Sequence, residues 1–221
     1  MHKIGPLLNK LFGTAYIKNL PNSIERKRSI TEQCNIINLN FFITQAANGI
    51  ELVNEDFTLQ HGRFFLQYPS SAGYLGNQLT TFRQIKNAIQ NNLSSLILLD
   101  DDCMFEHTQK LNITEYSRIE RELPSDWDII ILGEIGITDL TNKTIHYMKA
   151  TEHGQAMGSH AVAIRNTVYK DILITCKEMR YLGDGIIGRM IDIGKNVYII
   201  RPTLCYQNPL YFSDINKCFK Q

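Results

Sequence analysis

Continuous apolar runs alternate with amphipathic segments along this chain. The runs at residues 94–102 (SSLILLDDD) and 127–134 (WDIIILGE) are typical of strands buried on both faces of a parallel sheet. Apolar side chains recur at helical spacing across residues 73–92, which predicts a helix there. The same reasoning predicts further strands at residues 14–20, 39–45, 160–166 and 196–202, and further helices at residues 24–35, 114–123 and 167–179.

This alternation of strands and helices predicts an α/β fold. We expect a mostly parallel, open central sheet flanked by helices on both faces. The length of 221 residues suits one medium-sized domain. The prediction is a single domain over residues 1–221, with a core at about residues 14–208 and a C-terminal tail at 209–221. In such sheets, ligands bind outside the carboxyl ends of the strands.

The composition narrows the range of partners. A formal net charge of +1 argues against nucleic acid as a partner. No apolar run reaches the roughly 18 residues that a membrane span needs. The first residues, MHKIGPLLNKLFGTAYI, contain too short an apolar run for a secretory signal, so we expect a cytoplasmic protein. Five scattered cysteines without CxxC spacing favour reduced thiols over a disulfide framework or a zinc site.

Three adjacent carboxylates, those of Asp100, Asp101 and Asp102, end the first long apolar run. Like charges repel, and burial penalises their ionised forms, so a bound divalent cation would relieve both costs. Carboxylate oxygens suit Mg²⁺ or Mn²⁺. Strand alternation predicts that Asp100 and Asp102 share one side and hold the metal, while Asp101 contacts backbone or a basic side chain. The alternative is a solvated loop that caps a helix near Met104.

The sequence resembles glycosyltransferase family 25, which contains bacterial lipopolysaccharide galactosyltransferases and collagen galactosyltransferases. The matching blocks, in order between Tyr16 and Gln207, are AYIKNLPNSIERKRSI, ITQAANGIEL, GYLGNQLTTFRQIKNAI with LILLDDDCMF, LPSDWDIIILG, MGSHAVAIRNTVYKDIL and IRPTLCYQ. Thr80 and Thr81 stand where the family has a Ser-His pair, and Asp100 stands where its acidic motif begins with glutamate. Val162 or Ala163 replaces a usual aromatic residue. The resemblance is therefore to a divergent member.

The resemblance implies a GT-A-type fold with one Rossmann-like sheet and an acidic motif at a strand end. It also implies an inverting transferase that moves a hexose, galactose or glucose, from a UDP-sugar to a hydroxyl of a glycan or protein acceptor. Mn²⁺ (or Mg²⁺) bound by Asp100 and Asp102 would neutralise the leaving diphosphate. The donor-binding residues implied are Asn19, Arg26, Asp100, Asp101 and Gln207.

Inverting transfer needs a general base, for which the sequence favours Asp184. Asp184 lies between two glycines in YLGDGIIG and matches an aspartate of the family. The alternative is that it caps the helix that follows. His160 is a candidate metal ligand or a packed core residue, and Asp128 is expected to be structural. Tyr206 and Gln207 follow the last strand and are expected near the donor.

Two other functions stay open from the sequence. Residues 100–104 resemble the D-x-D-x-[T/V] motif of haloacid-dehalogenase-type phosphatases, with Asp100 as nucleophile and Asp102 as acid. That motif normally lies on the first strand, and Met104 occupies its fifth position. Loss of the Ser-His pair favours a second alternative, a degenerate transferase-like module that binds a nucleotide or glycan without catalysis.

Overall fold

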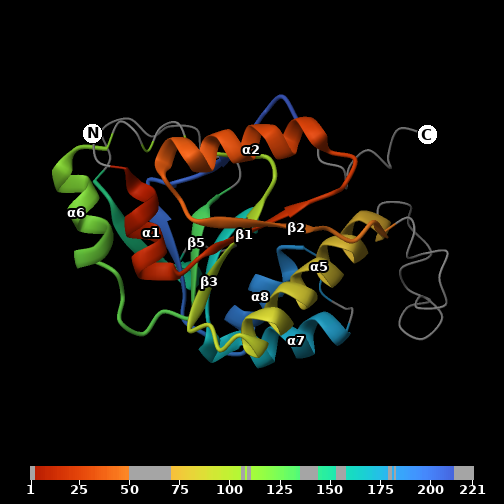
Figure 1. Ribbon diagram of the computed structural model, residues 1–221. Helices are drawn as coiled ribbons and strands as arrows, with labels where there is room; N and C mark the ends of the chain where they lie inside the picture. The colour runs from red at the N-terminus through yellow and green to blue at the C-terminus, as the bar shows by residue number, and fades with distance from the viewer. Residues whose placement is uncertain are drawn as a thin grey trace.

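The computed structural model describes residues 3–49, 71–105, 108, 111–134, 144–152, 158–178, 181 and 183–211. Within these residues a central sheet has the strand order β2-β1-β3-β7-β5-β8-β6 (Figure 1). Its strands are β1 (Ala15–Asn19), β2 (Phe41–Gln45), β3 (Ser95–Asp100), β5 (Ile129–Gly133), β6 (His146–Lys149), β7 (Ala161–Arg165) and β8 (Val197–Arg201). A small second ladder pairs β4 (Cys103–Met104) with β9 (Tyr206–Gln207).

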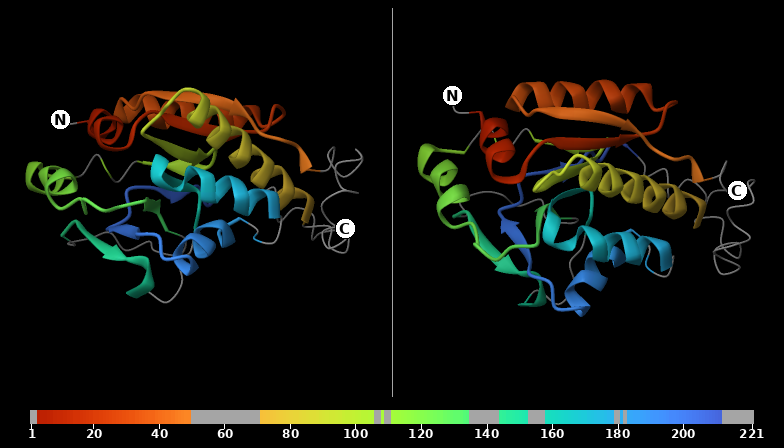
Figure 2. Two further views of the ribbon diagram at one scale, coloured as in Figure 1. Left: turned by 90° about the horizontal axis from the view of Figure 1, so that it is seen from below. Right: turned by 60° about the horizontal axis from the view of Figure 1, so that its bottom comes forward.

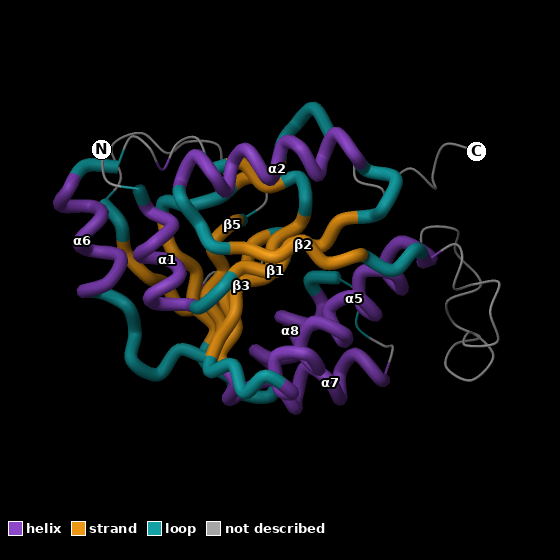
Figure 3. The backbone as a smooth tube through the Cα atoms, in the orientation of Figure 1, coloured by secondary structure: helices purple, strands orange, loops and turns teal. Residues whose placement is uncertain are grey.

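The helices lie on both faces of the sheet, as the sequence predicted (Figure 3). They are α1 (Ile4–Phe12), α2 (Ile24–Ile37), α5 (Ser71–Gln90), α6 (Ile113–Arg121), α7 (Tyr169–Glu178) and α8 (Gly185–Asp192), with short 3₁₀ turns at Ala150–Glu152 and Asn166–Val168. No helix in the described part of the chain is long and apolar enough to cross a membrane.

The sheet is mixed, but most of its strands share one direction. β1 is parallel to β2 and β3, and β5 is parallel to β8. β7 lies antiparallel between β3 and β5, and β6 is antiparallel to β8. The predicted α/β class with a mostly parallel sheet is therefore confirmed. The carboxyl ends of β1, β3, β5 and β8 meet the amino end of β7 at one edge.

Alternation along the strands divides the interior into two cores. Ile97 and Leu99 of β3 face α1, α2 and α6, where Phe12 and Trp127 pack edge to face with ring centroids 5.4 Å apart. Leu96 of β3 faces the opposite core beneath α5, α7 and α8. Figure 2 shows these two helical layers on either side of the strands. Burial on both faces explains why β3 and β5 are continuous runs of apolar residues.

Helix α1 was not predicted, because its segment was considered only as a candidate signal. Ile4, Leu7, Leu8 and Phe12 of this helix are all buried in the first core. Gly5 lies so close to the backbone of Asn38 that a Cβ would collide there. The single-domain organisation stays a prediction, and residues 212–221 of the predicted tail lie outside the described residues.

Candidate functional site

The aspartate triplet lies at the edge where the parallel strands end. Asp100 is the last residue of β3, and Asp101 and Asp102 form the turn into β4. The Asp100 amide donates to the His160 carbonyl at 2.8 Å, and the Asn208 amide donates to the Asp102 carbonyl at 2.7 Å. The backbone on both sides of the turn is thus fixed by His160, directly before β7, and by Asn208, directly after β9.

Asp100 is paired with a lysine from the neighbouring strand. Lys18 Nζ lies 2.8 Å from Asp100 Oδ1 and donates to Asn77 Oδ1 at 2.9 Å. The Lys18 side chain is only 8% exposed, whereas that of Asp100 is 28% exposed. The sequence analysis missed Lys18 as a site residue. The available signal was a lysine that directly follows Ala15, Tyr16 and Ile17 within a predicted strand.

The Asp101 carboxylate contacts two other residues predicted for the site, Asn19 and Arg26. Asn19 Nδ2 donates to Asp101 Oδ2 at 2.7 Å, and Arg26 Nη1 lies 3.1 Å from Asp101 Oδ1. Burial raises the pKa of Asp101, and both partners oppose that shift. The Arg26 guanidinium also lies 5.4 Å from the centre of the Tyr211 ring. Asp101 therefore contacts a basic side chain, and its contacts join the start of α2 to the triplet.

Asp102 is the carboxylate of the triplet that lacks a strong partner. Its side chain is buried, its Oδ1 has no hydrogen-bond partner within the described part of the chain, and its Oδ2 is 3.4 Å from Gln207 Nε2. Burial first, and then the charge of Asp100, raise the pKa of Asp102 to about 7. Such an oxygen needs either a proton or a cation. Gln207 reaches this place because β9 pairs with β4.

The protein side chains alone do not form a complete metal site in the described ranges. No group of three or more His, Cys, Asp or Glu there has a metal-binding arrangement. Asp100 and Asp102 would supply at most two carboxylates, and the remaining oxygens would have to come from water and a substrate phosphate. Mg²⁺ commonly binds in this way, through one or two carboxylates plus phosphates.

His160 lies behind the triplet and is almost fully buried. Burial lowers the pKa of His160, but the Cys205 thiol and the carboxylates of Asp100 and Asp102 outweigh it and raise the value overall. Its ring lies directly against Gly133, where a Cβ would collide with the imidazole. This position is that of a packed residue, and a ligand role for His160 stays a prediction.

Asp184 does not contact the triplet through any hydrogen bond seen here. It occupies the N-cap position of α8, but its side chain makes no capping hydrogen bond. Instead, Asp184 Oδ2 accepts from the Gly158 amide at 3.1 Å. Gly158 and Gly183 both have positive φ angles, of 108° and 51°, which favour glycine. Asp184 thus fixes the turn before His160, and its catalytic role stays a prediction.

Other residues singled out from the sequence have structural contacts. Asp128 lies at the opposite, amino end of β5, where it accepts from the Asn196 amide at 2.9 Å. Thr80, which with Thr81 stands in place of the family's Ser-His pair, accepts from the Ala47 amide at 2.8 Å and donates to the Gly76 carbonyl at 2.7 Å. These contacts join α5 to the segment after β2, which is a structural role for Thr80.

A second ion pair at the same edge was not predicted. Arg201, at the end of β8, donates to both carboxylate oxygens of Glu134, at 2.9 and 2.8 Å. Glu134 directly follows β5 and is 3% exposed. This pair is neutral in itself. Asp102 has no ion pair among the described residues, although the charges of Arg26 and His160 oppose the rise of its pKa.

Comparison with known proteins decides the family. The family model described as glycosyltransferase family 25 (LPS biosynthesis protein) matches residues 12–177. The chain belongs to glycosyltransferase family 25. This member is accordingly a glycosyltransferase, with a sugar donor and a glycan acceptor as its partners, and the phosphatase alternative has no support. None of the curated proteins matches it.

One solved structure supports the fold of this family 25 member, and a second is less similar. One is titled "crystal structure of a glycosyltransferase involved in the glycosylation of the major capsid of PBCV-1"; it has a TM-score of 0.50 and 8% identity, and covers 94% of this chain and 98% of that one. Another, "Crystal Structure of A197 from STIV", has a TM-score of 0.44 and 9% identity, with 87% and 82% covered. At such low identity the first likeness establishes the fold alone.

Proposed function

We propose that this glycosyltransferase moves a hexose from a UDP-sugar to a hydroxyl of a glycan or protein, with inversion and with Mn²⁺ or Mg²⁺. The observation that carries the proposal is the buried Oδ1 of Asp102, which has no hydrogen-bond partner beside the partly open Asp100. A divalent ion held by both residues would neutralise the diphosphate of the donor as it leaves.

The rest of the edge supports binding of an anionic donor. Lys18 supplies a buried positive charge next to Asp100. Asn19 and Arg26 hold Asp101 and thereby fix the turn that carries Asp102. Gln207 lies against Asp102 from the opposite side. Contacts of Asn19, Arg26, Asp101 and Gln207 with the phosphates or ribose of the donor are part of the proposal.

Asp184 is the general base in this proposal. A glycine on each side leaves room for an acceptor hydroxyl to approach its carboxylate. Only Oδ2 of Asp184 accepts from Gly158 in the described contacts. A proton from the acceptor hydroxyl would pass to the carboxylate as the hydroxyl oxygen attacks the sugar carbon.

The proposal is tested by calorimetry of UDP binding with and without Mn²⁺. We expect Asp102→Asn to lower the Mn²⁺-dependent affinity at least about tenfold, because the amide replaces a metal-binding charge. Asp192→Asn, at an exposed position on α8, is the matched control and should bind UDP as the unmodified protein does. Equal UDP affinity in Asp102→Asn and the control would refute the metal site.

One observation favours the alternative of a non-catalytic binding module. Lys18 already pairs with an oxygen of Asp100, the predicted first metal ligand. Release of UDP from UDP-galactose or UDP-glucose in the presence of Mn²⁺ separates the two functions. An active transferase releases UDP slowly even without acceptor, whereas a binding module leaves the sugar nucleotide intact.

A further inference from the structure

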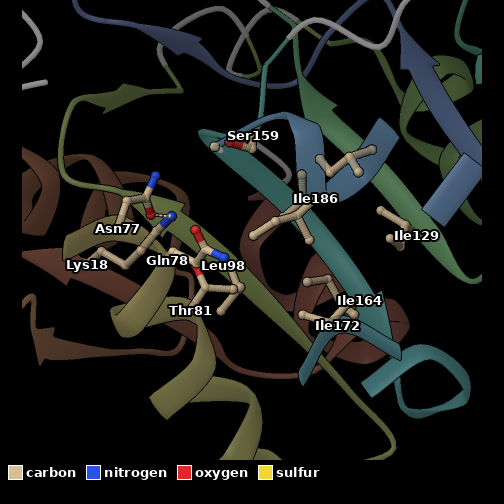
Figure 4. A pocket seen from close by; sticks show the side chains of 13 residues that line it. Lys18, Asn77, Gln78, Thr81, Leu98, Ile129, Ser159, Ile164, Ile172 and Ile186 are labelled. Atoms are coloured by element: carbon tan, nitrogen blue, oxygen red, sulfur yellow. Dashed lines mark hydrogen bonds between the residues drawn. The ribbon is translucent and has the colours of Figure 1, made fainter. Parts of the chain in front are cut away.

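A partly open cavity lies between the sheet and the layer formed by α5, α7 and α8 (Figure 4). Lys18 and Asn77, joined by their hydrogen bond, line it on the side of β1 and α5. Because Lys18 Nζ also contacts Asp100 Oδ1, the cavity lies one side chain away from the aspartate triplet. Lys18 is therefore the side chain that the cavity and the triplet share.

The wall of the cavity has one buried acceptor without a partner. Gln78 is 2% exposed, and its Nε2 donates to the Cys176 carbonyl of α7 at 2.9 Å. This bond fixes the amide and leaves Gln78 Oε1 buried, with no hydrogen-bond partner among the residues that the structure describes. An unpaired buried acceptor costs free energy, so a ligand that brings a donor to Gln78 gains a complementary contact.

The remaining wall is apolar, with hydroxyl groups beside it. Figure 4 shows Ile186 and Ile172 across the cavity from Gln78 and Thr81, with Ser159 at one end. The space is about 30 Å³, or room for about two water molecules. That is too small for a sugar ring and suits a short substituent with both an apolar and a polar part.

Resting on the transfer reaction proposed above, we propose that this cavity receives the acetamido group of an N-acetylhexosamine bound at the triplet. The acetamido N–H is the donor that Gln78 Oε1 lacks, and the carbonyl oxygen can accept from a nearby hydroxyl such as that of Thr81 or Ser159. The methyl group packs against the isoleucine wall, where burial of each methyl-sized group is favourable. The sugar is either that of the UDP-linked donor or that of the acceptor.

The experiment compares acetylated and unacetylated sugars on the same protein. Calorimetry with Mn²⁺ measures UDP-N-acetylglucosamine and UDP-N-acetylgalactosamine against UDP-glucose and UDP-galactose, with UDP alone as reference. A second arm, with UDP present, measures methyl glycosides of the same four sugars as acceptors. We expect an N-acetyl preference of about tenfold in one arm, as one methyl group and one hydrogen bond supply. The arm that shows the preference identifies the source of the group.

Variants that fill the cavity test whether it causes the preference. Ile186→Phe, and the milder Val162→Ile from β7, should bring the preference to about one and leave UDP affinity unchanged. Ile174→Phe is the control and should keep the preference, because Ile174 on α7 is 56% exposed. The milder variant adds a single methyl group, so it covers the case in which Ile186→Phe does not fold.

The outcomes separate this inference from the proposed function. Suppose that UDP binds but that acetylated and unacetylated sugars bind with equal affinity in both arms. The cavity then holds only water, and the inference alone is overturned. A preference that survives both filling variants would overturn it as well. Absence of any Mn²⁺-dependent UDP binding would instead refute the proposed function on which it rests.

Discussion

Lys18 and Asp100 are register partners on the adjacent parallel strands β1 and β3, and their side chains form an ion pair of 2.8 Å. A cation is thus built into the position where a divalent ion is proposed. Lys18 offsets one carboxylate of the triplet, and Arg26 offsets another. Asp102 keeps its unpaired oxygen in the buried part of the turn.

The first prediction concerns exchange between this lysine and a metal. Lys18→Met should lower the free energy of unfolding by about 1–3 kcal/mol in EDTA, because the partly buried Asp100 loses its partner. Mn²⁺ should then restore more stability to the variant than it adds to the unmodified protein, since the ion takes over the role of the ammonium group. Thermal shifts with and without Mn²⁺ measure both effects. An equal Mn²⁺-induced thermal shift in the two proteins would contradict the prediction that the ion takes the place of the Lys18 ammonium group.

The second prediction concerns Asp102 and pH in the metal-free protein. Its pKa is about 7 in the folded state, against 3.8 as the ordinary value. Between these values the folded state holds a proton that the unfolded state has released. The contribution of Asp102 to the free energy of unfolding is therefore largest at low pH and falls as the pH rises towards 7.

Urea unfolding in EDTA at several pH values measures this contribution. The stability of the unmodified protein relative to Asp102→Asn should fall with rising pH by on the order of 1 kcal/mol per pH unit across that interval. The same comparison with the exposed Asp192→Asn should show no such slope. A pH-independent difference for Asp102→Asn would show that this carboxyl ionises normally.

The third prediction concerns Asp184. Asp184→Asn keeps an oxygen that can accept from the Gly158 amide, so the fold should persist. Transfer should fall by about 10²–10⁴-fold if the carboxylate takes the proton of the acceptor, while the affinity for UDP and Mn²⁺ stays unchanged. Single-turnover transfer and calorimetry provide the two measurements. Turnover equal to that of the unmodified protein would remove Asp184 from the mechanism.

The fourth prediction concerns the packing of His160. Gly133→Ala would push a Cβ into the imidazole and towards the Cys205 carbonyl, so we expect destabilisation of about 1–3 kcal/mol. Gly188→Ala on α8 is the matched control, because a Cβ there meets nothing within 4 Å. That helical position should gain up to about 1 kcal/mol. A Gly133→Ala protein as stable as the parent would contradict the close fit of His160.

The local sequence pattern was enough to predict the α/β class and the main elements of the sheet. Strands β3 and β5 are buried on both faces, and a run of apolar side chains records that burial directly. The triplet could also be placed at the ligand-binding edge, because it follows the carboxyl end of a strand. These conclusions need only neighbouring residues, and the family assignment agrees with them.

The tertiary structure alone decided the direction of β7 and the partners of each carboxylate. The apolar residue pattern of a strand such as Ala161–Arg165 is the same whether the strand is parallel or antiparallel to its neighbours. Asp100, Asp101 and Asp102 are chemically identical in the sequence, yet Lys18 and Arg26 pair with two of them from about 75 or more residues away. Ion pairing and desolvation depend on such distant contacts, so local periodicity determines the elements and only the folded chain determines the chemistry of the site.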